Sequence, residues 1–118
     1  MTGSSLVPRT TSRKSMPALI DRMVQRIVKK FHPEKVILFG SHARGEAGPD
    51  SDVDLLVVMP VAGSKFEKAL DIRTALRSFA VPMDILVTTP EDFAWRKELV
   101  GTIEFPAHRE GKVLYANS

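Results

Sequence analysis

Two aspartates stand at the start of an apolar run, with the spacing that a strand requires to place them together. Asp52 and Asp54 are separated by one residue, and side chains two positions apart on a strand point to the same face. Aspartate is uncommon in strands, so two on one face of an otherwise apolar run need an explanation. Carboxylates this close repel each other, and at least one should resist ionisation. A divalent cation removes that conflict, and oxygen ligands suit Mg²⁺, so the pair predicts a metal site.

A Gly-Ser step lies upstream of the aspartates. Gly40 and Ser41 end the apolar run 35–39, and a polar loop follows over 45–50. The step offers a flexible turn, backbone N–H groups and a hydroxyl, the groups that bind phosphate. The Gly-Ser step alone would be an ordinary turn, and the aspartate pair alone would be a solvated strand end. Together they favour chemistry on a nucleoside triphosphate.

Gly40-Ser41, ten residues, then Asp52-Val53-Asp54 resembles the signature of the nucleotidyltransferases of the DNA polymerase β superfamily. The segments 39–45 and 51–57 resemble most closely the small stand-alone members, the minimal nucleotidyltransferases. These often act as the antitoxin partner of a HEPN-domain ribonuclease toxin. The signature covers fewer than twenty residues, and a looser likeness runs from about Ile20 to Tyr115.

The resemblance implies roles for three carboxylates. Asp52 and Asp54 would share two Mg²⁺ ions about 4 Å apart. Asp84, an acid in the apolar run 81–88, would complete the site of the catalytic ion and help to deprotonate the acceptor hydroxyl. The alternative for Asp84 is a strand-end carboxylate paired with a base such as Arg44 or Arg73.

The resemblance also implies nucleotide-binding residues. Gly40 and Ser41 would hold the β- and γ-phosphates of ATP, the expected substrate, with Arg44 and Ser51 as further contacts. His42 lies in the same loop, where contact with nucleotide and simple solvation are equally open.

Three functions remain. In the first, the chain transfers AMP from ATP to a hydroxyl, which the likeness to antitoxins suggests is a tyrosine of a HEPN toxin. In the second, it is a non-catalytic antitoxin that neutralises the toxin by covering it. The third is a small-molecule transferase like the aminoglycoside-modifying relatives, which usually carry a second domain for which 118 residues leave little room.

Elements of both kinds must position these residues. Apolar periodicity predicts helices over 16–31, 65–78, 90–99 and 103–109, and strands over 35–39, 52–59, 81–88 and 112–115. Ser41, Ser64 and Thr89 are expected to cap helices. Pro106 is expected to interrupt the last helix. The buried face of the second helix is expected to comprise Phe66, Ala69, Leu70, Leu76 and Phe79, and Trp95 is expected in the core or an interface.

Alternating helices and short strands predict an α/β domain with helices packed on a small sheet. Pattern alone leaves the strand order open, and the resemblance implies the mixed sheet of the polymerase β palm. A length of 118 residues suits one domain, expected over 16–118. Residues 1–15 are expected to be a disordered tail, and the run 6–9 resembles a protease-cleavage linker left by cloning.

Charge and composition narrow the partners. Of the 17 basic residues, three lie in the tail, which leaves 14 against 14 acidic residues. A neutral body argues against direct nucleic-acid binding on electrostatic grounds. No cysteine is present, so thiolate metal sites are excluded. No apolar run approaches the roughly 20 residues of a membrane span, and no secretory signal is visible, so we expect a cytoplasmic location.

Overall fold

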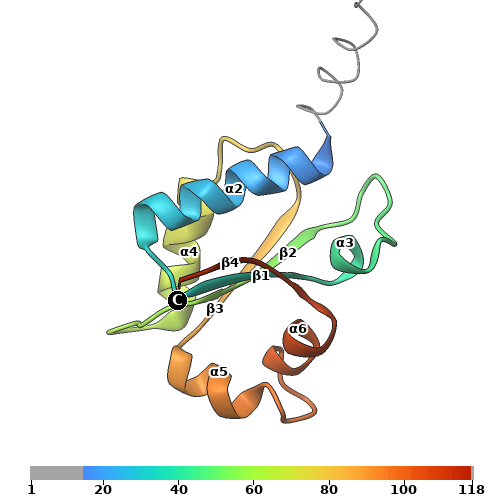
Figure 1. Ribbon diagram of the computed structural model, residues 1–118. Coiled ribbons are helices and arrows are strands. Elements are labelled where there is room, and N and C mark those ends of the chain that lie inside the picture. The colour runs from blue at the N-terminus through green and yellow to red at the C-terminus, as the bar shows by residue number, and fades with distance from the viewer. Residues whose placement is uncertain (1–14, 118) are drawn as a thin grey trace, which may run out of the picture.

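The computed structural model describes residues 15–117, which form a four-stranded sheet with helices on both faces (Figure 1). Along the chain these residues form α2 (Met16–Phe31), β1 (Lys35–Phe39), α3 (Ser41–Arg44), β2 (Val53–Val58), α4 (Lys65–Ala75), β3 (Met83–Thr88), α5 (Pro90–Arg96), α6 (Glu104–Glu110) and β4 (Lys112–Ala116). The predicted α/β class is confirmed. The predicted tail lies outside the described residues, except for Ser15, which caps α2.

The sheet is mixed, and its order is β3-β2-β1-β4. β1 pairs antiparallel with both β2 and β4, whereas β2 and β3 run parallel. The β2–β3 pair needs a crossover, and α4 supplies it. β3 and β4 are therefore the two edges, which explains why Pro82 is tolerated just before β3.

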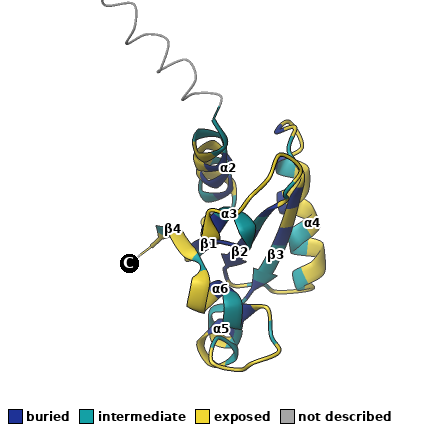
Figure 2. Cartoon of the chain, turned by 90° about the vertical axis from the view of Figure 1, so that its right-hand side faces the viewer, coloured by how far each residue is buried: buried dark blue, intermediate teal, exposed yellow. Residues whose placement is uncertain are grey.

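Both faces of the sheet are buried, as the apolar run of β2 predicts. Val53, Leu55 and Val57 pack under α2 and α4 in the larger core. Leu56 and Val58 pack on the other face, in a cluster with Phe93 of α5 and Ala107 of α6. Figure 1 shows α2 and α4 above the sheet and α5 and α6 below it, and in Figure 2 the central strands are dark while β4 is largely exposed.

Local capping signals set most helix starts. The Ser64 and Thr89 hydroxyls accept hydrogen bonds from the Glu67 and Asp92 amides, as predicted. The predicted Ser41 cap is wrong, because Gly40 occupies the cap position and no side chain caps α3. Pro106 does not interrupt α6, because it is the third residue of that helix, where an N–H has no helical acceptor to lose.

The predicted buried face of α4 is partly wrong. Phe66 and Leu70 are 72% and 47% exposed, while Ile72 and Leu76 are fully buried. Two apolar stripes on this stretch each have helical spacing, and only the one through Ile72 and Leu76 faces the sheet. The helix itself ends at Ala75 rather than at residue 78, and α5 ends at Arg96 rather than at 99.

Trp95 is not a core residue, since 56% of it is exposed. Among residues 15–117, no helix combines the length and apolar character that crossing a bilayer would need.

Candidate active site

Three aspartates gather at one end of the β2–β3 pair. Asp54 lies directly opposite Asp84 in the parallel register, so their side chains share a face of the sheet. Asp52 precedes β2 by one residue and belongs to the same face by alternation. All three carboxylates lie where β2 and β3 begin and β1 ends, since Phe39, the last residue of β1, pairs with Asp54.

The carboxylates influence one another electrostatically. The pKa of Asp54 is raised, first because partial burial disfavours its charge, and then because Asp84 and Asp52 repel it. His42 and Arg44 oppose that rise. The repulsive part of this rise is one that a bound cation would relieve.

The backbone of Gly40 lies against Asp54 of this cluster. Its φ is 74°, a conformation that side chains disfavour. A Cβ built at Gly40 would collide with Oδ2 of Asp54. Only glycine therefore allows the turn after β1 to lie against the carboxylate.

The short helix α3 follows that turn. The amides of Ala43 and Arg44 both donate to the Gly40 carbonyl at 3.1 Å. The amides of Ser41 and His42 and the Ser41 hydroxyl have no partner among residues 15–117. These free donors lie beside Gly40, as phosphate binding would require.

The loop that joins α3 to β2 is closed by its own hydrogen bonds. The Ser51 hydroxyl accepts from the Gly48 amide at 2.9 Å. His42 Nε2 lies 3.2 Å from the Ser51 carbonyl oxygen, so His42 holds the loop near Asp52 rather than standing free in solvent.

Arg44 lies between two acids. Its Nε donates to Glu46 at 2.9 Å, and its Nη1 lies 3.7 Å from Glu110 of α6. Within the described residues, neither Arg44 nor Arg73 forms an ion pair with Asp84, which is exposed and unpaired. The strand-end ion pair considered for Asp84 is therefore absent.

The family of this chain follows from its match to a protein-family model. The model of the nucleotidyltransferase domain matches residues 20–108 of the chain, from α2 into α6. The chain belongs to the nucleotidyltransferase domain family. The predicted family and enzyme class are confirmed.

Individual relatives agree with the family. A protein of Methanocaldococcus jannaschii that carries the name "Putative protein adenylyltransferase" is 35% identical over 83 residues, which cover 70% of this chain and 78% of the relative. The crystal structure of a nucleotidyltransferase of Sulfolobus solfataricus, also described as putative, superposes with a TM-score of 0.62 at 22% identity, and covers 92% of this chain and 86% of that one. A toxin–antitoxin crystal structure with AMP-PNP gives a TM-score of 0.53 at 17% identity, with 83% and 74% coverage. The two crystal structures support the fold alone.

The side chains of the nucleotidyltransferase site do not form a complete metal-coordination site in the described residues. In the described part of the chain, no three His, Asp or Glu side chains converge closely enough to hold an ion. The donor set nevertheless fits Mg²⁺, because three carboxylates supply hard oxygen ligands and their mutual repulsion is what a divalent cation would relieve. The metal roles of Asp52, Asp54 and Asp84 stay a prediction.

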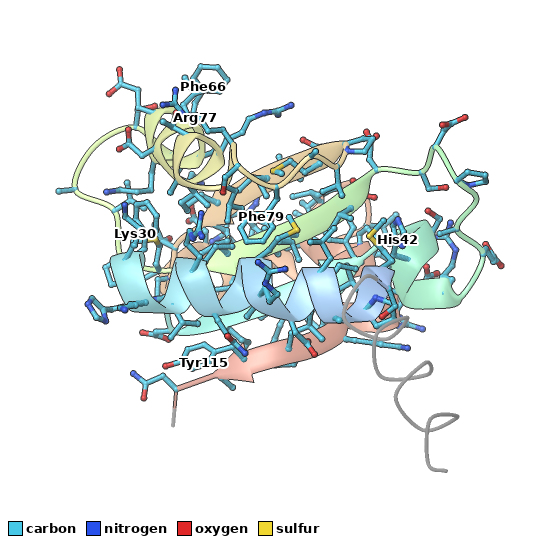
Figure 3. The ribbon with its side chains drawn as sticks, turned by 90° about the horizontal axis from the view of Figure 1, so that it is seen from above. Lys30, His42, Phe66, Arg77, Phe79 and Tyr115 are labelled. Carbon is cyan, nitrogen blue, oxygen red and sulfur yellow. The ribbon has the colours of Figure 1, made fainter. Side chains whose placement is uncertain are left out.

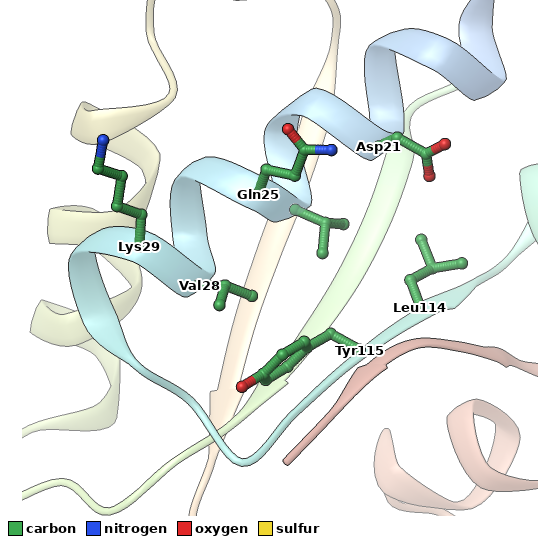
Figure 4. A pocket seen from close by; sticks show the side chains of 7 residues that line it. Asp21, Gln25, Val28, Lys29, Leu114 and Tyr115 are labelled. Atoms are coloured by element: carbon green, nitrogen blue, oxygen red, sulfur yellow. The ribbon is translucent and has the colours of Figure 1, made fainter.

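Grooves lie beside both edges of the described sheet, and the one along β3 includes a predicted catalytic residue. A groove of about 310 Å³ runs between α4 and β3 and includes Asp84. A groove of about 290 Å³ lies between α2 and β4, lined by residues such as Gln25 and Tyr115 (Figure 4). This second groove is at the opposite edge of the sheet and contains none of the predicted catalytic or nucleotide-binding residues.

Sequence reasoning missed two features of the site. Glu110 is the second partner of Arg44, and no local pattern links residues so far apart. The contact between Gly40 and Asp54 had a partial signal, because a glycine directly after a buried strand often marks a close approach.

Proposed function

We propose that this nucleotidyltransferase moves AMP from ATP to a hydroxyl of a protein, and that the acceptor is a tyrosine of a HEPN-domain ribonuclease toxin, so that the chain acts as an antitoxin. The observation that carries the proposal is the direct pairing of Asp54 with Asp84 beside the Gly40 turn. The name of the Methanocaldococcus jannaschii relative supports protein adenylylation. The toxin–antitoxin structure with AMP-PNP supports the use of this fold in such a pair.

The metal ligands in this proposal are Asp52, Asp54 and Asp84, and two Mg²⁺ ions are expected. When bound, Mg²⁺ would neutralise charge on the triphosphate and lower the barrier to displacement at phosphorus. The raised pKa of Asp54 supports its assignment, because a carboxylate that resists ionisation among other acids is stabilised by a cation.

The reaction exchanges the phosphoanhydride bond between the α- and β-phosphates of ATP for a phosphate ester of the acceptor. The acceptor oxygen forms a bond to the α-phosphorus while the bond from that phosphorus to the bridging oxygen breaks, and pyrophosphate leaves with the electron pair. Asp84, which is exposed and unpaired, receives the proton of the acceptor hydroxyl. The amides of Ser41 and His42, the Gly40 turn, Arg44 and the Ser51 loop hold the phosphates.

A second candidate function is neutralisation by covering the partner without chemistry. It is favoured by an apolar patch on the segment from α5 to α6, defined by the exposed side chains Trp95, Leu99, Val100 and Ile103. Such a patch suits a protein interface.

The deciding experiment uses ATP labelled at the α-phosphate, Mg²⁺ and a HEPN protein encoded beside this chain. We expect label on the HEPN protein with the wild-type chain, and none with Asp54→Asn or Asp84→Asn. Asp71→Asn, a matched change on the exposed surface of α4, should leave labelling intact. Neutralisation of the toxin by Asp54→Asn at full strength, with no label in the wild type, would reject the enzymatic account and favour the second candidate.

A further inference from the structure

The groove between α4 and β3 combines an open strand edge with an apolar helix face. The carbonyl of Pro82, just before β3, accepts from the Val53 amide of β2, and the carbonyl of Thr88, the last residue of β3, accepts from the amide of Met59, just after β2. By alternation, the backbone groups of Met83, Ile85 and Val87 point away from β2. No other strand or side chain among residues 15–117 bonds to them. Consecutive residues 84–87 line the groove, so its floor is this unpaired edge.

The opposite wall is the stripe of α4 that faces away from the core. Phe66, Ala69, Leu70 and Arg73 all line the groove and follow the helical spacing i, i+3, i+4, i+7. Figure 3 shows Phe66 projecting outward at this edge of the molecule, away from α2. A helix beside an unpaired edge strand is an arrangement that binds extended peptides, since the edge bonds the peptide backbone and the helix contacts alternate side chains.

The polarity of the groove follows from the crossover. α4 runs from the end of β2 back to the start of β3, so Arg73 in its last turn lies at the Asp84 end, and Phe66 in its first turn lies at the Val87 end. Arg73 is exposed and forms no ion pair among the described residues. The groove therefore presents a free cation next to the active site and apolar side chains farther away.

We propose that this groove binds the acceptor as an extended segment that adds to β3 as a fifth strand, with its hydroxyl-bearing residue opposite Asp84. The inference rests on the proposed function, because it identifies how the acceptor of that reaction is held. Residues paired on neighbouring strands share a face at a spacing of about 4.8 Å. A residue opposite Asp84 therefore projects onto the same face as Asp84 and Asp54, where its hydroxyl can reach them.

Alternation also predicts the chemistry of the segment. The residue next to the hydroxyl-bearing one points to the α4 side, where Arg73 favours an acid. Two positions farther on, the chain again faces α4, where Leu70 favours an apolar side chain. The pattern is thus hydroxyl, acid, any residue, apolar.

The probes are two fluorescent hexapeptides, Tyr-Glu-Thr-Val-Thr-Val and its reversed order, because the groove allows either strand direction. Binding to the full chain is measured by fluorescence anisotropy. Leu70→Lys blocks the groove, and Val113→Lys on the β4 edge is the control, since the two residues are 47% and 55% exposed. We expect saturable binding of one peptide, weakened at least about tenfold by Leu70→Lys and within about twofold of wild type in Val113→Lys.

Backbone methylation separates strand addition from simple apolar contact. Only alternate amides of an added strand donate to its neighbour. N-methylation of one alternating set should abolish binding, and methylation of the other set should not. Equal effects of the two sets, equal losses in the two protein variants, or no saturable binding would each overturn the proposal.

A transfer assay distinguishes failure of this inference from failure of the proposed function. We expect AMP transfer to the bound peptide to exceed transfer to N-acetyl-tyrosinamide, which is too short to span the groove, by about tenfold or more in kcat/KM. Leu70→Lys should remove that advantage and leave the small acceptor unaffected. If transfer to the peptide is unchanged in Leu70→Lys, the acceptor-binding role of the groove is rejected and the proposed transferase activity is retained. If the peptide binds in a way that depends on Leu70 but neither acceptor is modified, the groove is retained as a peptide-binding site and the proposed transferase activity is rejected.

Discussion

At the scale of single residues, two glycines with the same φ distinguish the cost of backbone strain from the cost of a steric clash. Gly40 and Gly45 both have a φ of 74°, but a Cβ at Gly40 meets the Asp54 carboxylate and a Cβ at Gly45 meets nothing within 4 Å. We expect Gly45→Ala to lower the free energy of unfolding by about 1 kcal/mol, the cost of the left-handed conformation. Gly40→Ala should cost more and should also displace Asp54, so nucleotide transfer falls at least about tenfold. Urea denaturation and transfer rates measured on both variants check this, and equal behaviour would contradict it.

We expect ionised Asp54 to lower the stability of the fold while it supports nucleotidyl transfer. Its pKa is raised from the ordinary value of 3.8, so the folded chain holds this proton more tightly than the unfolded chain does. Ionised Asp54 therefore destabilises the fold above its raised pKa, and the penalty disappears as the pH falls through that value. Asp54→Asn should unfold at an equal or higher urea concentration at pH 7, with a gain that shrinks on acidification, and should lose at least about 100-fold in transfer.

The controls for this prediction are another aspartate and the metal. Asp71→Asn should change neither stability nor transfer. Mg²⁺ should raise the melting temperature of the wild type more than that of Asp54→Asn, because the ion binds only the folded carboxylate cluster. A lower urea midpoint in Asp54→Asn at pH 7 would show that the carboxylate stabilises the fold instead.

At the scale of elements, a buried polar network ties β3 to α6. The Thr88 hydroxyl donates to Glu104 at 2.7 Å, and Arg96 of α5 donates to the same carboxylate at 3.1 Å. Burial alone would raise the pKa of Glu104, but these hydrogen bonds lower it below its ordinary 4.5. Glu104 therefore contributes stability that is fully present above pH 4.5 and is lost as the pH falls through its lowered pKa.

Removing one hydroxyl tests the network. We expect Thr88→Val to lower the free energy of unfolding by about 1–3 kcal/mol at pH 7, because it leaves a buried carboxylate oxygen without its donor. The midpoint of acid unfolding should move to higher pH. Thr74→Val on the exposed side of α4 should stay within about 0.5 kcal/mol of wild type, and a matching loss there would contradict the assignment.

Local signals predicted the elements, and long-range contacts explain what was missed. Ser64 and Thr89 bond amides three residues away, so the sequence alone reveals these caps. The exposure of Phe66 depends on which of two apolar stripes meets the sheet, which no periodicity decides. Glu104 reads as an acid at a helix start, and only the approach of β3 makes it a buried partner of Thr88. The sequence likewise placed Asp54 and Asp84 on strands, but their pairing required the strand order.

At the scale of the whole molecule, the apolar patch on the segment from α5 to α6 predicts an interface. Val100 is 76% exposed, so Val100→Glu should leave the fold intact. If the patch contacts the HEPN partner, we expect this variant to weaken the complex at least about tenfold, measured by titration. Acrylamide quenching of Trp95 should be strong in the isolated chain and reduced in the complex.

The control for the patch is on another face. Val113→Glu, on the β4 edge, should leave both the complex and the protection of Trp95 unchanged. Unaltered affinity in Val100→Glu would mean that the patch does not contact the partner.

The crossover through α4 separates the carboxylates of the site along the chain. Phe39 and Asp54, which pair across the antiparallel strands, are 15 positions apart, whereas Asp84 lies 30 positions after Asp54. Closing the longer loop costs more entropy before any contact repays it. A chain synthesised only through α4 already carries Asp52 and Asp54 but lacks the third carboxylate. If Asp84 acts as proposed, catalytic competence is gained when the edge strand docks, and local detachment of that strand removes it while the rest of the fold persists.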